Sequence, residues 1–376
     1  MTIDEYAATF GEEPGYLDFA RVGPIGRTVE EEQTAQTRLL ATARFGTLPS
    51  LERQDARVRE AVAALTGFRP NQIVFQPNSS QGMMHAMFGI TGGVALSAAE
   101  FPGMTFAAVR AAEALGVLSP IWLDTDHGRI TPGNLRDQLT SSVAAVAVSL
   151  VDFRTGYLTD LEGIRQVIGD RLLIVDAIQG FGIVDAPYAL ADVVVSGGQA
   201  WTRAGWGTGF LALSDRAADR LTPVFSGFDG TDFESSDADD MPLDEVAPPT
   251  HGAGAFQISR PDPMAQARLA AALEEIAEVG VPAINDAIAM KISRVIDLAD
   301  EFAVPVASPR SEAERAGIVL LEPDSDQLTV LTASLYNHGV TTTRRGRQVR
   351  LSAHVSTDDE TFDMLRAGLV SFGSAI

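Results

Sequence analysis

The stretches VDAIQGFG (residues 175–182) and VVVSGGQAWTRAGWGTGF (residues 193–210) decide the fold of this chain. Both begin in apolar residues with the composition of a buried strand, and they leave that strand at a polar residue, Asp176 or Ser196, with glycines close behind. An aspartate that ends a strand is by itself commonplace and more often caps a helix. The two blocks therefore predict buried strands whose ends carry polar side chains.

Short apolar runs of the same kind recur along the chain and alternate with helical segments or turns. This alternation predicts an α/β fold in which helices cover both faces of the sheet. Helices are expected within residues 50–68, 264–280, 283–302 and 358–372. The predicted strands are residues 73–76, 94–100, 119–125, 143–151, 172–178, 191–197 and 208–213.

Composition excludes several classes of protein. A chain of 376 residues with 45% hydrophobic content can bury a large core, and two domains are expected. The net charge of -22 argues against a nucleic-acid partner, which needs a basic surface. No apolar run is long enough to span a bilayer, and residues 1–15 lack the pattern of a signal peptide, so we expect a cytoplasmic protein without a membrane partner. The five histidines show no metal-ligand spacing, and no metal site is expected.

The Asp-x-x-Gln block at 176–179, followed by a Ser-Gly block and a Gly-x-Gly-Phe turn at 207–210, resembles the cofactor-binding core of fold-type I pyridoxal 5'-phosphate (PLP) enzymes. The branch is the aminotransferase class V family, which includes cysteine desulfurases, kynureninases and C–S lyases. The resemblance covers nearly the whole chain and implies a large domain with a mixed, mostly parallel seven-stranded sheet and a small C-terminal α+β domain.

The same resemblance implies an N-terminal arm at residues 1–20, a large PLP-binding domain at 21–262 and a small domain at 263–376. It also implies a homodimer with shared sites and an arm, YLDFARVGP (16–24), that lines the entrance; the alternative for that arm is a surface strand and turn. The acidic segment 225–256 lacks periodicity and is expected to be a solvated loop, or a flap over the neighbouring subunit's site.

The resemblance assigns cofactor contacts to residues of both blocks. PLP acts as an electron sink when its ring nitrogen is protonated, and Asp176 is placed to hold that proton. Gln179 would reach the phenolic oxygen of the cofactor. Ser196 and Gln199 would complete the phosphate cup, where Gln199 replaces the more common histidine and keeps an N–H donor.

The segment FQPNSSQGMMHAMF (75–88) predicts a strand, a turn and then a helix, and a helix N-terminus with hydroxyl donors suits a phosphate. By resemblance, Ser79 and Ser80 take the phosphate-facing places, although a serine-rich helix cap explains the segment equally well on its own. Phe101 follows a glutamate at the place where the family stacks a ring on the pyridine, with core packing as the alternative. Phe153, three residues before Gly156, leans away from cysteine desulfurases, which favour asparagine there.

Near the C-terminus, QVRLSAHVS (348–356) resembles the family motif whose arginine grips the substrate's α-carboxylate. Arg350 is the expected substrate-orienting residue, because a guanidinium binds a carboxylate through two parallel hydrogen bonds. His354 is expected to be structural. The family usually places a threonine near residues 254–262 to reach the partner's phosphate, and Ser259 or Arg260 could substitute for it.

Ala200 stands where the family has its Schiff-base lysine. A methyl group can neither form that bond nor move protons at the substrate carbon, so the chain as written is expected to bind PLP without turnover. An engineered substrate-trapping substitution is favoured over a natural silent paralogue, because the other site elements are intact. Lys291, the sole lysine, falls in an amphipathic helix and is expected on a solvated face.

The absence of cysteine excludes a cysteine desulfurase of the usual kind, which passes sulfur to its own thiolate. We therefore expect a β-eliminating C–S lyase acting on a cysteine-derived amino acid, with a class V aminotransferase or epimerase as the alternative. Trp201, Trp206 and Phe228 suggest an aromatic-walled pocket, although the family position of Trp201 mostly packs.

Overall fold

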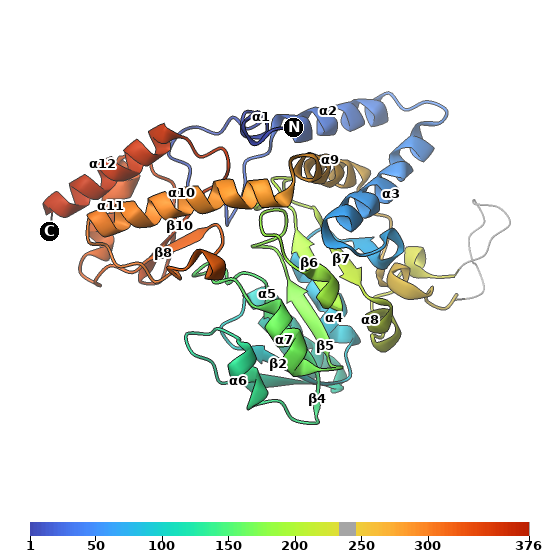
Figure 1. Ribbon diagram of the computed structural model, residues 1–376. Coiled ribbons are helices and arrows are strands. Elements are labelled where there is room, and N and C mark those ends of the chain that lie inside the picture. The colour runs from blue at the N-terminus through green and yellow to red at the C-terminus, as the bar shows by residue number, and fades with distance from the viewer. Residues whose placement is uncertain (233–245, 376) are drawn as a thin grey trace.

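The computed structural model describes residues 1–232 and 246–375 (Figure 1). Its larger sheet has seven strands in the order β1-β7-β6-β5-β4-β2-β3, in which only β7 runs opposite to the others. This confirms the mixed, mostly parallel sheet expected from the sequence. The strands are β1 (Ile73–Phe75), β2 (Gly92–Ser97), β3 (Leu118–Leu123), β4 (Val143–Ser149), β5 (Leu172–Asp176), β6 (Val193–Gly197) and β7 (Gly209–Leu213).

Both faces of this sheet are covered by helices. Alternate residues of β5 enter different hydrophobic clusters: Leu173 and Val175 pack on one side, and Leu172 and Ile174 on the other. Such a strand must be apolar throughout, which is why it reads as an uninterrupted run. The helices of this part of the chain are α3 (Thr47–Thr66), α4 (Ser79–Gly89), α5 (Pro102–Leu115), α6 (Pro132–Arg136), α7 (Leu161–Ile168) and α8 (Asp215–Arg220).

Two long helices lead away from the large sheet. Helix α9 (Pro263–Val279) begins at the Asp262 cap with proline in its first turn, and it packs against α3 and α2 (Arg27–Ala41). Gly280, at φ 90°, ends α9 and starts α10 (Val281–Glu301), which runs towards the C-terminal sheet (Figure 1). Because α9 packs on earlier helices, the domain boundary at 262/263 stays a prediction.

The C-terminal part is a three-stranded antiparallel sheet in the order β8-β10-β9, with helices α11 (Leu328–Asn337) and α12 (Asp359–Ala375). The strands are β8 (Ile318–Leu321), β9 (Thr343–Arg345) and β10 (Gln348–Ser352). Val349 and Leu351 point into the core, so Arg350 points to the opposite face of β10. Thr343 lies directly across from Arg350, and Arg345 across from Gln348, which places these side chains on that same face.

Residues 17–20 of the N-terminal arm are buried rather than lying on the surface. After α1 (Ile3–Ala7), Tyr16 bridges to Thr341 and Asp18 bridges to Ser352, so the arm runs beside the C-terminal sheet. Leu17 and Phe19 are fully buried. This burial contradicts the alternative of a surface strand at residues 17–20, and the lining of the entrance stays a prediction.

No helix in the described residues is long and apolar enough to cross a lipid bilayer. Within the same residues, no group of three or more His, Asp or Glu side chains could hold a metal ion. Of the acidic segment at 225–256, residues 233–245 lie outside the described residues; the short turns Phe228–Gly230 and Gly252–Phe256 flank them.

Candidate cofactor and substrate site

The site residues expected from the sequence gather where parallel strands end. β5 ends at Asp176, β6 at Gly197 just after Ser196, and β2 and β4 end at Ser97 and Ser149. Carboxyl ends of parallel strands meet at one edge of a sheet, and in open α/β sheets that edge is where ligands bind.

Asp176 is buried, with 3% of its surface exposed. Its carboxylate accepts a hydrogen bond from the backbone N–H of Ile178 at 3.1 Å, and no described residue forms an ion pair with it. Burial raises the pKa of Asp176 to about 6. A buried carboxylate without a protein cation leaves this edge of the sheet suited to a positively charged ligand group.

Gln179 connects three segments of the chain. Its Nε2 donates to the backbone oxygen of Ala20 at 2.9 Å, and its Oε1 accepts from Nε1 of Trp201 at 2.8 Å. The side-chain oxygen is thereby used, and one N–H of the amide is left for a ligand oxygen. Trp201 itself is 1% exposed, so it packs and does not line a pocket.

The N-terminus of α4 offers donors for an anion. Asn78 caps the helix by accepting from the N–H of Gln81 at 2.9 Å, while the N–H groups of Ser79 and Ser80 have no intrahelical acceptor. Ser79 is buried and Ser80 is exposed. Helix α4 lies close against β6, since a Cβ on Gly82 would come 3.0 Å from the Val195 side chain.

The end of β6 and the loop after it carry glycines with little room for a side chain. A Cβ on Gly197 would lie 2.5 Å from Oε1 of Gln199, and one on Gly198 would lie 2.3 Å from Oγ1 of Thr208. Ser196 is buried and its hydroxyl donates to the Gly197 carbonyl at 3.3 Å. Ala200 is 1% exposed.

Two phenylalanines predicted to flank the cofactor contact each other. The rings of Phe101 and Phe153 meet edge to face, with centroids 5.2 Å apart. Next to them the partly buried Glu100 accepts from Oγ of Ser149 at 2.5 Å and from its N–H at 3.2 Å. Burial raises the pKa of Glu100 to about 7, opposed by these hydrogen bonds.

Arg350 is 1% exposed, and its donors are only partly used. Nη1 donates to the backbone oxygen of Phe153 at 2.8 Å, and Nη2 lies 3.5 Å from a carboxylate oxygen of Asp18. Nε and Nη2 have no hydrogen-bond partner although both are buried. Burial lowers the pKa of Arg350 to about 10. Buried guanidinium donors left unpaired are costly, and a ligand carboxylate would satisfy them.

A profile of the aminotransferase class-V family matches residues 50–372. The chain belongs to the aminotransferase class-V family. Members of this family use PLP, so the cofactor expected from the sequence is confirmed.

The chain is similar to a curated protein, the kynureninase of Deinococcus radiodurans, with 27% identity over 201 residues. That match covers 51% of the chain and only 48% of the kynureninase, about half the length of the relative.

Among solved structures, the apo cysteine desulfurase of Thermococcus onnurineus NA1 matches with TM-score 0.84 at 20% identity, covering 96% of this chain and 95% of that one. The cystine C–S lyase C-DES with cysteine persulfide matches with TM-score 0.83 at 19% identity, covering 95% and 97%. A C-DES variant with a lysine replaced by alanine, in which glycine is covalently linked to PLP, gives 0.84 at 19% identity, covering 95% and 96%.

The residues of this class V site fit PLP. The buried Asp176 has no protein cation and suits the protonated ring nitrogen, and the free donors at the start of α4 suit the phosphate. Phe101 lies after the short turn that follows β2, directly before α5, and it is partly exposed. The individual contacts of these residues with the cofactor stay predictions.

Two further expectations concern basic residues. His354 is fully buried and stacks on Phe19 with centroids 5.3 Å apart, in keeping with a structural role. Lys291 is not on a solvated face: it is half-buried, and its Nζ donates to the backbone oxygen of Thr357 at 2.5 Å. The amphipathic pattern predicts the helix correctly, but it carries no information about the loop at Thr357 that contacts this side chain.

The remaining expectations fall on exposed residues. Ser259 and Arg260 are both exposed, and Arg260 pairs with Glu52 at 2.9 Å. Trp206 and Phe228 are 71% and 48% exposed. All four side chains are exposed in the single chain, so their expected roles at the site stay predictions.

Sequence reasoning missed Asp18 and Arg203. Asp18 is 3% exposed; it accepts from Oγ1 of Thr343 at 2.7 Å and faces Arg350. Arg203 is completely buried, with its guanidinium carbon 3.5 Å from the centroid of the Phe10 ring. An acidic residue alternating with Leu17 and Phe19 in the arm was the available signal for Asp18; no local pattern marks Arg203.

Arg203 ties the arm to the loop after β6. Its Nη2 lies 2.5 Å from Glu12, Nη1 donates to Oγ of Ser356 at 2.8 Å, and Nε donates to the oxygen of Pro24 at 2.5 Å. Because Arg203 follows Ala200 by three residues, this cluster fixes the arm, the loop and the segment after β10 relative to one another.

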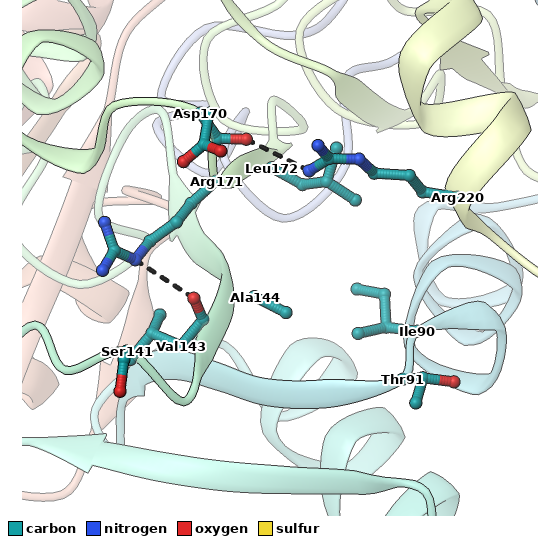
Figure 2. Close-up of a pocket in the computed structure, with 9 residues that line it drawn as sticks. All are labelled: Ile90, Thr91, Ser141, Val143, Ala144, Asp170, Arg171, Leu172 and Arg220. Carbon is teal, nitrogen blue, oxygen red and sulfur yellow. Dashed lines mark hydrogen bonds between the residues drawn. The ribbon is translucent and has the colours of Figure 1, made fainter.

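A pocket shown in Figure 2 lies at the other end of the strands. Thr91 precedes β2, Val143 begins β4, and Asp170 and Arg171 precede β5, so its lining comes from the amino ends of the parallel strands. Its two nearest cations are occupied: Arg171 donates to the Val143 oxygen and Arg220 to the Asp170 oxygen. This pocket is therefore separate from the candidate site.

Proposed function

We propose that this chain binds PLP without a covalent link, holds an amino acid by its α-carboxylate, and does not turn it over. The observation that carries the proposal is the buried guanidinium of Arg350, in which Nε and Nη2 make no hydrogen bond and Nη1 donates to Phe153, whose ring contacts Phe101. A substrate carboxylate would satisfy those donors and fix which bond at its Cα stands perpendicular to the cofactor plane.

PLP, when bound, supplies an electron sink for charge that develops at the substrate's Cα. Asp176 would hold the proton on the ring nitrogen, and Ser79, Ser80, Ser196 and Gln199 would hold the phosphate. Gln179 would donate its remaining N–H to the phenolic oxygen, and the ring would lie on Phe101. Ala200 has no group that can take or return a proton at Cα, which is why we expect no turnover.

With a lysine at position 200, the favoured reaction is β-elimination from a cysteine-derived amino acid. It removes the Cα proton, breaks the Cβ–S bond, releases a thiol, and with water leaves pyruvate and ammonia. The lack of any cysteine in the sequence supports this over a persulfide-forming desulfurase. A class V aminotransferase or epimerase is the second candidate, since one scaffold hosts several outcomes.

The alanine at position 200 has two explanations, an engineered substitution and a natural silent paralogue. An engineered substitution is favoured, because the burial of Asp176 and Arg350 and the free donors at the α4 N-terminus suit a catalytic site. The C-DES variant with a lysine replaced by alanine holds glycine on its PLP, which is the behaviour we expect of this chain. A natural silent paralogue is the alternative.

The test begins with the chain as it stands. PLP should be retained on gel filtration, yet borohydride reduction should leave no cofactor on the polypeptide, as judged by intact mass. A reduced adduct on Lys291 would contradict the proposal, and so would the absence of PLP binding.

The second step uses Ala200→Lys. We expect covalent PLP attachment and, with cysteine conjugates and their sulfoxides, release of pyruvate. Conversion of PLP to pyridoxamine phosphate without release of pyruvate would favour the aminotransferase over the lyase. Normal PLP attachment without any activity would favour the silent paralogue.

We also propose a symmetric homodimer with sites at the interface. Support comes from exposed apolar side chains around the α2–α3 turn, where Leu40, Phe45 and Leu48 are 46%, 105% and 62% exposed, and from the exposed Ser259 and Arg260. Sedimentation at micromolar concentration should give a dimer. A monomer that still binds PLP tightly would refute it.

A further inference from the structure

The substrate side of the site holds more positive than negative charge. Arg345 and Arg350 lie on the same face of the β9–β10 hairpin, and both contact Phe153, Arg345 through its guanidinium and Arg350 through a hydrogen bond to the backbone oxygen. Arg21 adds to this positive charge, since it lowers the pKa of both arginines. Asp18 is the one carboxylate that opposes them in the same interactions. Three guanidinium groups and one carboxylate give this side of the site a net charge of about +2, which a ligand with two negative charges would neutralise.

Arg345 is the unpaired member of this group. It lies on the same face of the β9–β10 hairpin as Arg350, and no described residue forms an ion pair with it or accepts a hydrogen bond from it. Its Nε is buried without a partner. By contrast, Arg154, the other arginine near Phe153, is neutralised by Asp152 at 2.6 Å.

Phe153 sets the spacing between the two arginines. Its backbone oxygen accepts from Arg350, and its ring lies 5.1 Å from the guanidinium carbon of Arg345. The same ring also contacts Phe101. A ligand whose α-carboxylate binds Arg350 therefore has a second cation nearby, because Arg345 contacts the same phenylalanine.

We propose that the site selects amino acids with an acidic side chain, and that Arg345, supported by Arg21, binds the second acid group. This rests on the proposed function and narrows it to substrates whose β-substituent carries a carboxylate. A neutral side chain would leave Arg345 partly desolvated and unpaired, which disfavours it relative to the acidic analogue.

The test uses PLP-loaded protein as it stands, titrated with two pairs of probes of matched shape: L-aspartate against L-asparagine, and L-glutamate against L-glutamine. Binding is followed by the cofactor's absorbance and by calorimetry, neither of which needs turnover. In at least one pair the acidic member should bind about tenfold tighter or more, the size expected of one charge-assisted hydrogen bond.

Arg345→Gln should remove the preference and leave the affinity for the neutral members within about twofold, while Arg345→Lys should keep part of it. Arg347→Gln is the matched control, because Arg347 is exposed on the same hairpin and should leave the preference intact. Equal affinities within both pairs, no binding by the acidic members, or equal losses for acidic and neutral probes in Arg345→Gln would each overturn the inference. Loss of PLP binding in the unaltered protein would instead refute the proposed function.

Discussion

The cofactor side and the substrate side of this site are built in different ways. The cofactor side, comprising the strand ends at Asp176 and Ser196 and the start of α4, comes from local blocks of sequence in which a strand, a turn and a helix follow directly. The substrate side, comprising residues 16–20 of the arm and the β9–β10 hairpin, joins the two ends of the chain. The first can be found by pattern, whereas the second exists only after folding.

Arg203 links the two sides, and removing it should have the largest effect. Arg203→Gln leaves Glu12, whose side chain is 10% exposed, without its charged partner, at a cost of roughly 3–5 kcal/mol. We expect a lower urea midpoint, faster proteolysis of the arm, and weaker binding of both PLP and amino acids. Arg27→Gln, at an exposed arginine of the same region, is the control. An unchanged arm with full stability would show that the two sides are independent.

The substrate side can be broken alone at Arg350. Arg350→Ala should weaken amino-acid binding about 100-fold, since about 3 kcal/mol is the upper range for hydrogen bonds to charged groups, and should spare PLP affinity. Arg350→Lys should not rescue it, because an ammonium cannot make two parallel hydrogen bonds. Titration of PLP-loaded protein measures both. Equal amino-acid affinity before and after the change would remove Arg350 from the site.

The cofactor side can be broken alone at Asp176. Asp176→Asn removes the charge that a protonated ring nitrogen requires, and PLP affinity should fall about 10–100-fold, or roughly 1.5–3 kcal/mol. Equilibrium dialysis against PLP measures this. The variant should fold at least as well as the parent without cofactor, because a buried unpaired carboxylate is gone. Unchanged PLP affinity would assign Asp176 to capping alone.

The smallest expected effect is a pH dependence at Glu100. Its pKa is raised to about 7, so the folded protein binds a proton more tightly than the unfolded chain between about pH 4.5 and 7. This contribution to stability is therefore present at low pH and is lost as the pH rises through that window.

Glu100→Gln should consequently stabilise the cofactor-free protein by roughly 1–3 kcal/mol at pH 8 and by little at pH 4.5, measured by urea midpoints. A constant difference across this range would show that Glu100 ionises normally. Asp176 contributes in the same direction, so the Asp176→Asn variant should flatten the remaining slope.

These contrasts also explain what could be predicted from the sequence. The seven strands and the long helices follow from apolar patterning, whereas Asp176, Ser196 and Phe101 were assigned by the resemblance of their sequence blocks to the family. Arg350 could be found because β10 carries a short motif. Asp18, Arg203 and Arg345 could not, since each acquires its role from a partner far away in sequence, as when Asp18 meets Thr343 and Arg203 meets Glu12. Lys291 was misplaced for the same reason.

The bridge between the arm and the C-terminal sheet has a consequence for synthesis. The N–H of Ala20 bonds Ser352, 332 positions later, and that of Gly15 bonds Thr361, 346 positions later. On the ribosome the arm emerges well before these partners, so Leu17 and Phe19 lack their core contacts while the intervening residues are being made. Such late, long-range closure exposes apolar segments to misassembly. The cofactor side of the site can therefore form during synthesis well before the substrate side is complete.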